Sequence, residues 1–259
     1  HLEWAYFDTN KIYFSTDINE VLDLSNTIIL AIPSPYVKSC LDEINIDISN
    51  KKIISAVKGM IPDENTLVTD YIHERFGIPH ENIGVIAGPC HAEEIALERL
   101  SYLTVGCKDK ERALEWQKLF TTPYVHTTPS NDVEGLEYAS VMKNIYAIAA
   151  GICKSLHYGD NFQAVLLTNA MHEMIRFTKA KSDIQRDITD SGYLGDVLVT
   201  AYSNFSRNRQ FGQMIGMGYS VKAAQTEMEM VAEGYYGTKA IWLANQDVLV
   251  DLPIVEAVY

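Results

Sequence analysis

The segment KKIISAVKG, residues 51–59, best indicates the fold of this chain. It is a short apolar run rich in β-branched residues, and it ends at a lysine and a glycine. Two similar runs, TIILAI at 27–32 and NIGVIA at 82–87, end at Pro33 and at Gly88. Continuous apolar runs of this length are typical of parallel strands that are buried on both faces of a sheet.

Helix-like stretches separate these runs. Amphipathic segments lie at 36–44, 65–76 and 92–100, and a further strand at 102–107 and a helix at 110–120 are predicted after them. The repeated order of strand, helix and strand predicts a doubly wound parallel α/β sheet of the Rossmann type.

The pattern changes near residue 131, after which apolar and small residues recur at helical spacing. Residues 133–156 form the longest such stretch, and they carry so little charge that we expect a buried central helix. Further helices are predicted at 162–177, 196–202, 221–232 and 238–245. We therefore predict two domains, a sheet domain at residues 1–131 and an all-helical domain at 132–259.

The composition excludes several classes of protein. The chain has 259 residues, of which 21 are basic and 34 acidic, so its formal net charge is −13. An apolar fraction of 47% and a charged fraction of 21% exclude a disordered, collagen-like or coiled-coil chain. The acidic balance argues against binding to nucleic acid or to anionic membranes. No apolar run reaches membrane-spanning length, so we expect no stable insertion into a membrane.

The cysteines and histidines show none of the spacings of a metal site. Cys40, Cys90, Cys107 and Cys153 are far apart in the sequence, and no H-E-x-x-H motif is present. We expect free thiols, a reducing cytoplasmic location and no bound metal.

Two groups follow predicted strands, at the edge where ligands bind in open parallel sheets. Lys58 comes directly after one strand and is suited to meet an anion, although a solvated loop lysine is the alternative. Gly88 opens GPCHAEE at 88–94, which starts a helix whose free N–H groups suit a phosphate. The alternative is ordinary capping, in which the two glutamates complement the helix dipole.

Lys143 and Asn144 lie inside the most apolar helical stretch of the chain. A buried lysine is costly to the fold, and proteins use such lysines for proton transfer near neutral pH. The alternative is a lysine at the helix edge whose ammonium group reaches solvent. Both interpretations stand when the helix is considered alone.

Asp196 and Thr200 are four residues apart, so a helix would place this carboxylate and this hydroxyl on one face. Ser206, Arg207 and Asn208 then bring a hydroxyl, a guanidinium group and an amide together. Arginine is the preferred planar partner of phosphate, although a basic surface turn would show the same pattern. Neither a G-x-G-x-x-G nor a P-loop motif is present. The residues alone therefore predict an α/β enzyme with a cationic, phosphate-ready cleft between two domains.

Taken together, several blocks resemble the NAD(P)-dependent glycerol-3-phosphate dehydrogenases of the bacterial type. The matching segments are KNIYAIAAG at 143–151, YGDN at 158–161, GD at 195–196, SRNRQFG at 206–212, KG at 58–59, GPCHAEE at 88–94 and EG at 233–234. The resemblance extends from about residue 15 to the end of the chain, with the blocks in the order of that family.

The resemblance implies a role for each matching residue. Lys143 corresponds to the general acid/base, and Asp196 pairs with it as the second catalytic residue. The positions that match the substrate site are Lys58, Gly88, Cys90, Asn144, Thr200, Ser206, Arg207 and Asn208. The positions that match the dinucleotide site are Ala92, Arg207, Val231 and Glu233. Cys90 stands where the family usually has a serine, and a thiol is a weaker hydrogen-bond donor than a hydroxyl.

The implied reaction interconverts sn-glycerol 3-phosphate and dihydroxyacetone phosphate by hydride transfer with NAD or NADP, and it supplies glycerol 3-phosphate for phospholipid synthesis. The resemblance also implies a homodimer. One alternative is a related dehydrogenase of another hydroxy acid. Another is a truncated, non-catalytic chain of the same family that acts in substrate binding or subunit contact. We expect a fragment because the family has a first β-α-β unit with a glycine-rich loop before the segments found here.

Overall fold

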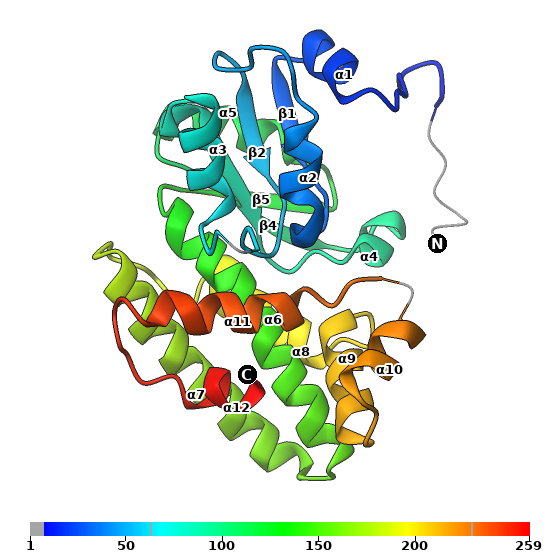
Figure 1. The fold of residues 1–259 in the computed structure, drawn as a ribbon, viewed down its shortest axis with the longest axis vertical. Helices are drawn as coiled ribbons and strands as arrows, with labels where there is room; N and C mark the ends of the chain where they lie inside the picture. The colour runs from blue at the N-terminus through cyan, green and yellow to red at the C-terminus, as the bar shows by residue number, and fades with distance from the viewer. Residues whose placement is uncertain (1–7, 63, 229) are drawn as a thin grey trace.

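The computed structural model describes residues 8–62, 64–228 and 230–259. Strands and helices alternate as far as residue 130, and the described residues after it form helices and loops without strands. Figure 1 shows the two parts stacked along the long axis, with the sheet and its helices above the remaining helices. The two parts are called the sheet part and the helical part below.

The sheet has five strands, which follow the order of the sequence: β1 (Thr27–Leu30), β2 (Lys52–Ser55), β3 (Ile83–Ala87), β4 (Ser101–Cys107) and β5 (Val125–Ser130). The first three strands are parallel, β4 runs antiparallel to β3, and β5 is parallel to β4. The predicted fold class, a Rossmann-like sheet followed by a helical part, is confirmed, but the sheet is mixed and not wholly parallel.

The reversal at β4 has a simple cause in the connection before it. Only one helix, α4 (Ala92–Ala96), joins β3 to β4, and it has five residues. A helix of that length rises only about 7.5 Å, which is too short to return the chain to the opposite edge of the sheet. The backbone N–H of Tyr102 instead donates to the carbonyl of Pro89, so β4 starts beside the end of β3 and runs back.

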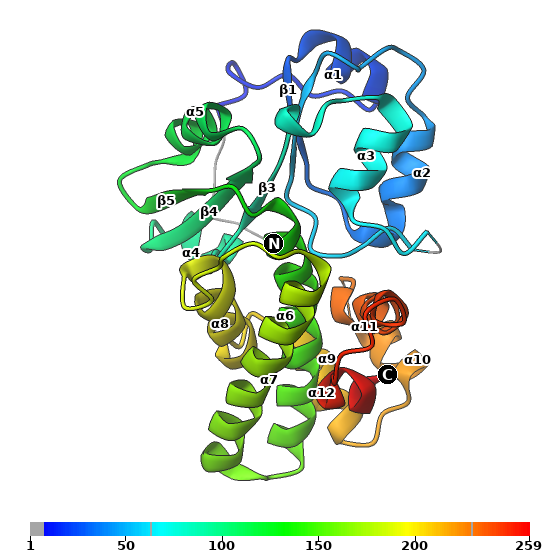
Figure 2. The ribbon, with the colours of Figure 1, turned by 90° about the vertical axis from the view of Figure 1, so that its left-hand side faces the viewer.

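Helices cover both faces of the sheet, as Figure 2 shows. The further elements of this part are α1 (Ile18–Leu24), α2 (Val37–Asp42), α3 (Val68–Phe76), α5 (Lys110–Phe120) and short 3-10 turns at Ser34–Tyr36 and His80–Asn82. Ile53 lies in the core with Ile72 of α3, whereas its neighbour Ile54 lies in a separate core with Trp116 of α5. Successive side chains of a strand point to opposite faces, so the apolar runs mark strands that are buried on both sides.

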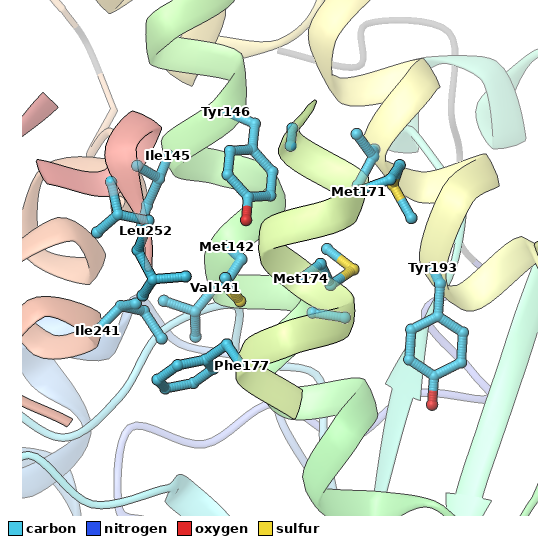
Figure 3. Close-up of a cluster of buried hydrophobic side chains, with 14 of the residues drawn as sticks. Val141, Met142, Ile145, Tyr146, Met171, Met174, Phe177, Tyr193, Ile241 and Leu252 are labelled. Carbon is cyan, nitrogen blue, oxygen red and sulfur yellow. The ribbon is translucent and has the colours of Figure 1, made fainter. Parts of the chain in front are cut away.

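The helical part is built around one central helix. Its elements are α6 (Val133–Ser155), α7 (Gly159–Lys181), a π-helical turn at Ser191–Gly195, α8 (Asp196–Tyr202), α9 (Arg207–Gly216), α10 (Val221–Glu227), α11 (Glu233–Asn245) and α12 (Pro253–Val258). The side chains of α6 are buried almost without interruption over its first five turns, as the sequence predicted. Met142 of α6 lies in one core with Met174 and Phe177 of α7 (Figure 3).

Some elements differ from the sequence prediction. The patterns did not indicate β5, α9 or α12, and α11 begins at Glu233 and not at residue 238. Ser206 is the N-cap of α9 and accepts a hydrogen bond from the backbone N–H of Arg209, so the segment that includes Arg207 opens a helix. None of the described helices has the length and hydropathy needed to cross a membrane.

Candidate active site

The carboxyl ends of β1, β2 and β3 face the helical part, and several hydrogen bonds join the two parts there. The Asn144 side chain donates to the carbonyl of Lys58 (3.1 Å), and the backbone N–H of Ser34 donates to Glu233 (2.8 Å). The backbone N–H of Gly88 donates to the carboxylate of Asp196 (3.0 Å). The edge where open sheets bind ligands therefore meets the helices that carry most of the predicted site residues.

Lys143 and Asp196 form a buried ion pair at this edge. The Nζ of Lys143 lies 2.5 Å from Oδ1 of Asp196, and both side chains are buried. The second carboxylate oxygen accepts the N–H of Gly88, whose φ of +116° lies in the region that favours glycine. Both predicted catalytic residues are thus adjacent, and the Asp196 carboxylate is held from two sides.

Lys58 follows the end of β2, the strand next to β3, and Asn144 lies beside Lys143 on α6. The ammonium group of Lys58 donates to the carbonyl of Ile86 in β3. Burial, followed by the positive charge of Lys143, lowers the pKa of Lys58 to about 8. Lys58 is therefore a cation that titrates close to neutral pH, next to the Lys143–Asp196 pair.

The remaining predicted substrate residues surround the join of α8 and α9. The hydroxyl of Thr200 donates to the carbonyl of Asp196 (2.6 Å). The side-chain oxygen of Asn208 accepts the N–H of Gly234 at the start of α11 (2.8 Å). Arg207 is exposed at the first position of α9, and within the described residues its guanidinium group makes no hydrogen bond or ion pair. Arg207 is therefore available to an anionic ligand.

Cys90 and His91 lie between β3 and α4. Burial raises the pKa of the Cys90 thiol to about 11, although the nearby Lys58 opposes this shift, so the thiol is neutral at pH 7. The ring of His91 lies 6.1 Å from the ring of Phe205, and its Nε2 is buried with no hydrogen-bond partner in the described part of the chain. Burial and then the charge of Lys143 lower the pKa of His91. No spacing pattern in the sequence marks His91.

The predicted dinucleotide positions lie on several elements of the two parts. Ala92 is exposed at the start of α4, Val231 is partly buried before α11, and Glu233 binds both the backbone N–H and the hydroxyl of Ser34. An exposed, unpaired guanidinium group and a carboxylate beside a strand end suit the phosphate and the hydroxyl groups of a dinucleotide. The residues present therefore fit one end of such a cofactor.

Glu137 and Ser34 are two further polar groups at this junction that the sequence analysis did not select. Glu137 of α6 is buried and accepts hydrogen bonds from the backbone N–H and hydroxyl of Thr69 at the start of α3. Burial raises the pKa of Glu137 to about 8. A glutamate inside an apolar helical stretch is the same kind of signal as Lys143, so the rule that selected Lys143 also selects Glu137.

One cavity of the described structure lies away from the candidate site. A cavity of about 660 Å³ lies between α9 and α11, where its lining includes Phe211, Tyr235 and Tyr236. None of the predicted site residues lines that cavity. We therefore locate the candidate site by the chemistry of the groups around Lys143.

Comparison with known families agrees with this arrangement of groups. The family profile described as NAD-dependent glycerol-3-phosphate dehydrogenase C-terminus matches residues 132–259, and the profile for the N-terminus of the same family matches residues 6–113. The chain belongs to the NAD-dependent glycerol-3-phosphate dehydrogenase family. The resemblance stated from the sequence is thereby confirmed.

Individual members of the family are similar over the whole chain. Glycerol-3-phosphate dehydrogenase [NAD(P)+] of Staphylococcus carnosus strain TM300 is 31% identical over 261 residues, which cover 100% of this chain and 78% of the relative. The enzyme of the same name from Staphylococcus aureus strain JH9 is 32% identical over 262 residues, with the same coverage.

Solved structures of the family share the fold. The crystal structure of glycerol-3-phosphate dehydrogenase from Coxiella burnetii has a TM-score of 0.86 at 26% identity and covers 93% of this chain and 74% of that one. The glycerol-3-phosphate dehydrogenase of Saccharomyces cerevisiae has a TM-score of 0.79 at 25% identity and covers 95% and 74%. D-mandelate dehydrogenase in complex with NADH matches at a TM-score of 0.57 and 15% identity, covering 90% and 75%, which shows the fold alone.

Proposed function

We propose that this glycerol-3-phosphate dehydrogenase interconverts sn-glycerol 3-phosphate and dihydroxyacetone phosphate with NAD or NADP, and that Lys143 is its general acid/base. The observation that carries the proposal is the buried Lys143–Asp196 ion pair at the carboxyl edge of the sheet. In the cell, the glycerol 3-phosphate formed is a precursor for phospholipid synthesis.

Lys143 moves the proton that accompanies hydride transfer. When the substrate is oxidised, neutral Lys143 takes the proton of the hydroxyl on the middle carbon. When it is reduced, protonated Lys143 donates to the carbonyl oxygen of dihydroxyacetone phosphate. Asp196, held by the N–H of Gly88, orients the ammonium group. General acid/base catalysis of this kind contributes about a hundred- to ten-thousandfold.

The substrate phosphate binds to the cluster at the start of α9. Arg207, with no protein partner in the described residues, supplies the planar guanidinium group that suits a phosphate. Ser206, Asn208 and Lys58 complete its surroundings, while the other predicted substrate positions, Gly88, Cys90, Asn144 and Thr200, lie toward the reacting carbon. Binding at the phosphate end holds the middle carbon beside Lys143, which is the orientation effect that positioning supplies.

Bound NADH or NADPH supplies the hydride. Ala92, Arg207, Val231 and Glu233 hold the dinucleotide in this proposal, and the Glu233–Ser34 contact keeps the loop after β1 in place beside it.

The domain roles and the assembly belong to the same proposal. Residues 1–131 form the dinucleotide-binding domain and residues 132–259 the substrate domain, and each domain also contributes residues to the other site. We expect a cytoplasmic homodimer, which light scattering after size-exclusion chromatography and cell fractionation would test.

The test of the function is a direct assay of dihydroxyacetone phosphate reduction, followed by the loss of NADH or NADPH absorbance. We expect turnover with this substrate and none with unphosphorylated dihydroxyacetone or with 2-oxo acids. Equal rates with a 2-oxo acid would instead indicate a dehydrogenase of another hydroxy acid. Binding of the substrate without turnover would indicate a non-catalytic member of the family.

A further inference from the structure

A second buried charged cluster lies at the start of α6, about three turns before Lys143. Its members are Asp132, which is the N-cap of α6, together with Arg186 and Tyr193. Both charged side chains are 6% exposed, and Tyr193 is buried. These three residues are called the brace below. None of the three is assigned to substrate or cofactor in the reaction described above.

The contacts of Arg186 use its whole guanidinium group. Nε and Nη2 both donate to the carboxylate of Asp132, the second at 3.1 Å. Nη1 donates to the carbonyls of Thr178 (3.1 Å) and Ser182 (2.8 Å), and Nη2 also donates to the hydroxyl of Ser182. Arg186 thereby ties the end of α7 to the start of α6.

The Asp132 carboxylate likewise accepts hydrogen bonds from several groups. It accepts the backbone N–H of Gly135 (3.0 Å) and the hydroxyl of Tyr193 (2.5 Å), in addition to Arg186. A Cβ atom at position 135 would overlap both the Asp132 carboxylate and the Arg186 guanidinium group. Glycine at this position therefore allows the close approach of the pair to the helix start.

Tyr193 links the brace to Asp196. It lies in the π-helical turn Ser191–Gly195, which runs without a break into α8, and Asp196 is the first residue of α8. A second contact of the turn joins the hydroxyls of Ser191 and Thr104 of β4 at 3.3 Å. Figure 3 shows Tyr193 apart from the other labelled core side chains, on the far side of α7 from Ile241 and Leu252. Single π-helical turns are rare in proteins, and those that do occur are often found at functional sites.

We propose that Tyr193, held by Asp132 and Arg186, is a positioning residue that fixes the π-helical turn and so aims the Asp196 carboxylate at Lys143. Asp132 is the N-cap of the helix that carries Lys143, so a turn anchored to Asp132 sets the place of Asp196 relative to Lys143. Proton transfer is sensitive to such placement, because a misplacement of about 1 Å can cost about a hundredfold in rate. This inference rests on the proposed roles of Lys143 and Asp196.

The decisive experiment is a double-mutant cycle between Tyr193→Phe and Asp196→Asn, with kcat and KM measured for dihydroxyacetone phosphate reduction. Tyr193→Phe removes one hydroxyl and keeps the ring in the core. We expect it to lower kcat about tenfold, with KM changed less than about twofold. In the Asp196→Asn background the same substitution should lower kcat less than about twofold, because residues that act as a unit are non-additive.

Several outcomes would overturn the inference. Full kcat in Tyr193→Phe, or the same fold loss in both backgrounds, would make the brace a structural feature that acts independently of Asp196. If Asp196→Asn alone kept full activity, the proposed catalytic role of Asp196 would fail, and the inference with it. Loss of activity in Asp196→Asn together with full activity in Tyr193→Phe would overturn the inference only. Asp196→Glu serves as the background if Asp196→Asn turns over too slowly to measure.

Two further variants supply a control and a substitute for Tyr193→Phe. Tyr138→Phe is the matched control, because Tyr138 also lies on α6 and packs edge-on against Phe177 with ring centroids 5.1 Å apart; its kcat should stay within about twofold of the starting value. If Tyr193→Phe does not fold, Ser191→Ala removes the contact to Thr104 from the same turn and leaves the buried charges paired. It should lower kcat with the same dependence on Asp196, and unchanged kcat would count against the inference.

Discussion

The central helix carries two buried ion pairs, and they differ in how completely they are satisfied. Arg186 and Asp132 at its start are each 6% exposed, and Lys143 and Asp196 are 10% and 2% exposed. All five N–H groups of Arg186 have acceptors on Asp132, Thr178 and Ser182. Among the described residues, Asp196 is the one hydrogen-bond partner of Lys143, whose ammonium group has three donors.

The difference is the one expected if the first pair holds the fold and the second, as proposed above, acts on a ligand. A fully satisfied buried pair has no capacity left for a further group and serves as a rigid joint. Lys143 has unused hydrogen-bond donors at the sheet edge where ligands bind in open sheets. Burial and charge alone do not distinguish the two pairs, whereas the count of unused donors does.

The largest effect is expected from Lys143→Ala, which removes the pair that acts. We expect kcat to fall at least about a hundredfold, because the proton carrier is lost, while the circular dichroism spectrum stays unchanged. Lys154→Ala, in the last turn of the same helix, is the matched control and should keep its activity. A Lys143→Ala variant with more than about a tenth of the original kcat would make Lys143 structural.

The next largest effect is expected from Arg186→Met, which breaks the pair that holds the fold. It leaves the Asp132 carboxylate buried without its partner, and such changes cost about 3–5 kcal/mol of unfolding free energy. Urea unfolding measures this loss. Arg176→Met is the control, because Arg176 forms an exposed pair with Asp251 and should cost less than about 1 kcal/mol. Equal losses in the two variants would remove the distinction between the pairs.

Arg207→Lys tests whether the exposed cation of the site binds the phosphate. Lysine keeps the charge but loses the planar fork, so we expect KM for dihydroxyacetone phosphate to rise about tenfold with a smaller change in kcat. Arg209→Lys is the control, since Arg209 already donates to the side chain of Asn204 (2.9 Å). Unchanged kinetics in Arg207→Lys would assign Arg207 to the solvated surface.

The smallest effect is expected in the pH dependence of kcat/KM, which the titration of Lys58 should shape. Its pKa of about 8 means that it is a cation below that pH and loses its charge above it. The rate constant kcat/KM, which reports groups of the free enzyme, should therefore fall as the pH rises through about 8. Lys58→Arg keeps the charge and should move this fall to higher pH. A profile that is identical in the two proteins would show that Lys58 does not bind the phosphate.

Much of the architecture could be predicted from the sequence. Apolar runs with β-branched residues marked the first four strands, and the low charge of residues 133–156 marked the central helix. Such signals are local, because strand and helix periods appear in neighbouring residues. β5 was missed since its sequence VHTTPS is largely polar and partly exposed, so it lacks an apolar run.

By itself the sequence determined the alternation of strands and helices, the position of Lys143 inside an apolar helix and the family of the protein. Only the tertiary structure decided that Lys143 meets Asp196, 53 residues away, that Glu233 binds Ser34, and that Arg186 reaches Asp132. These contacts join elements distant in the chain, and they depend on how α6 packs against its neighbours. The number of donors that a buried charge leaves unused is therefore a property of the packing, which no local pattern of residues records.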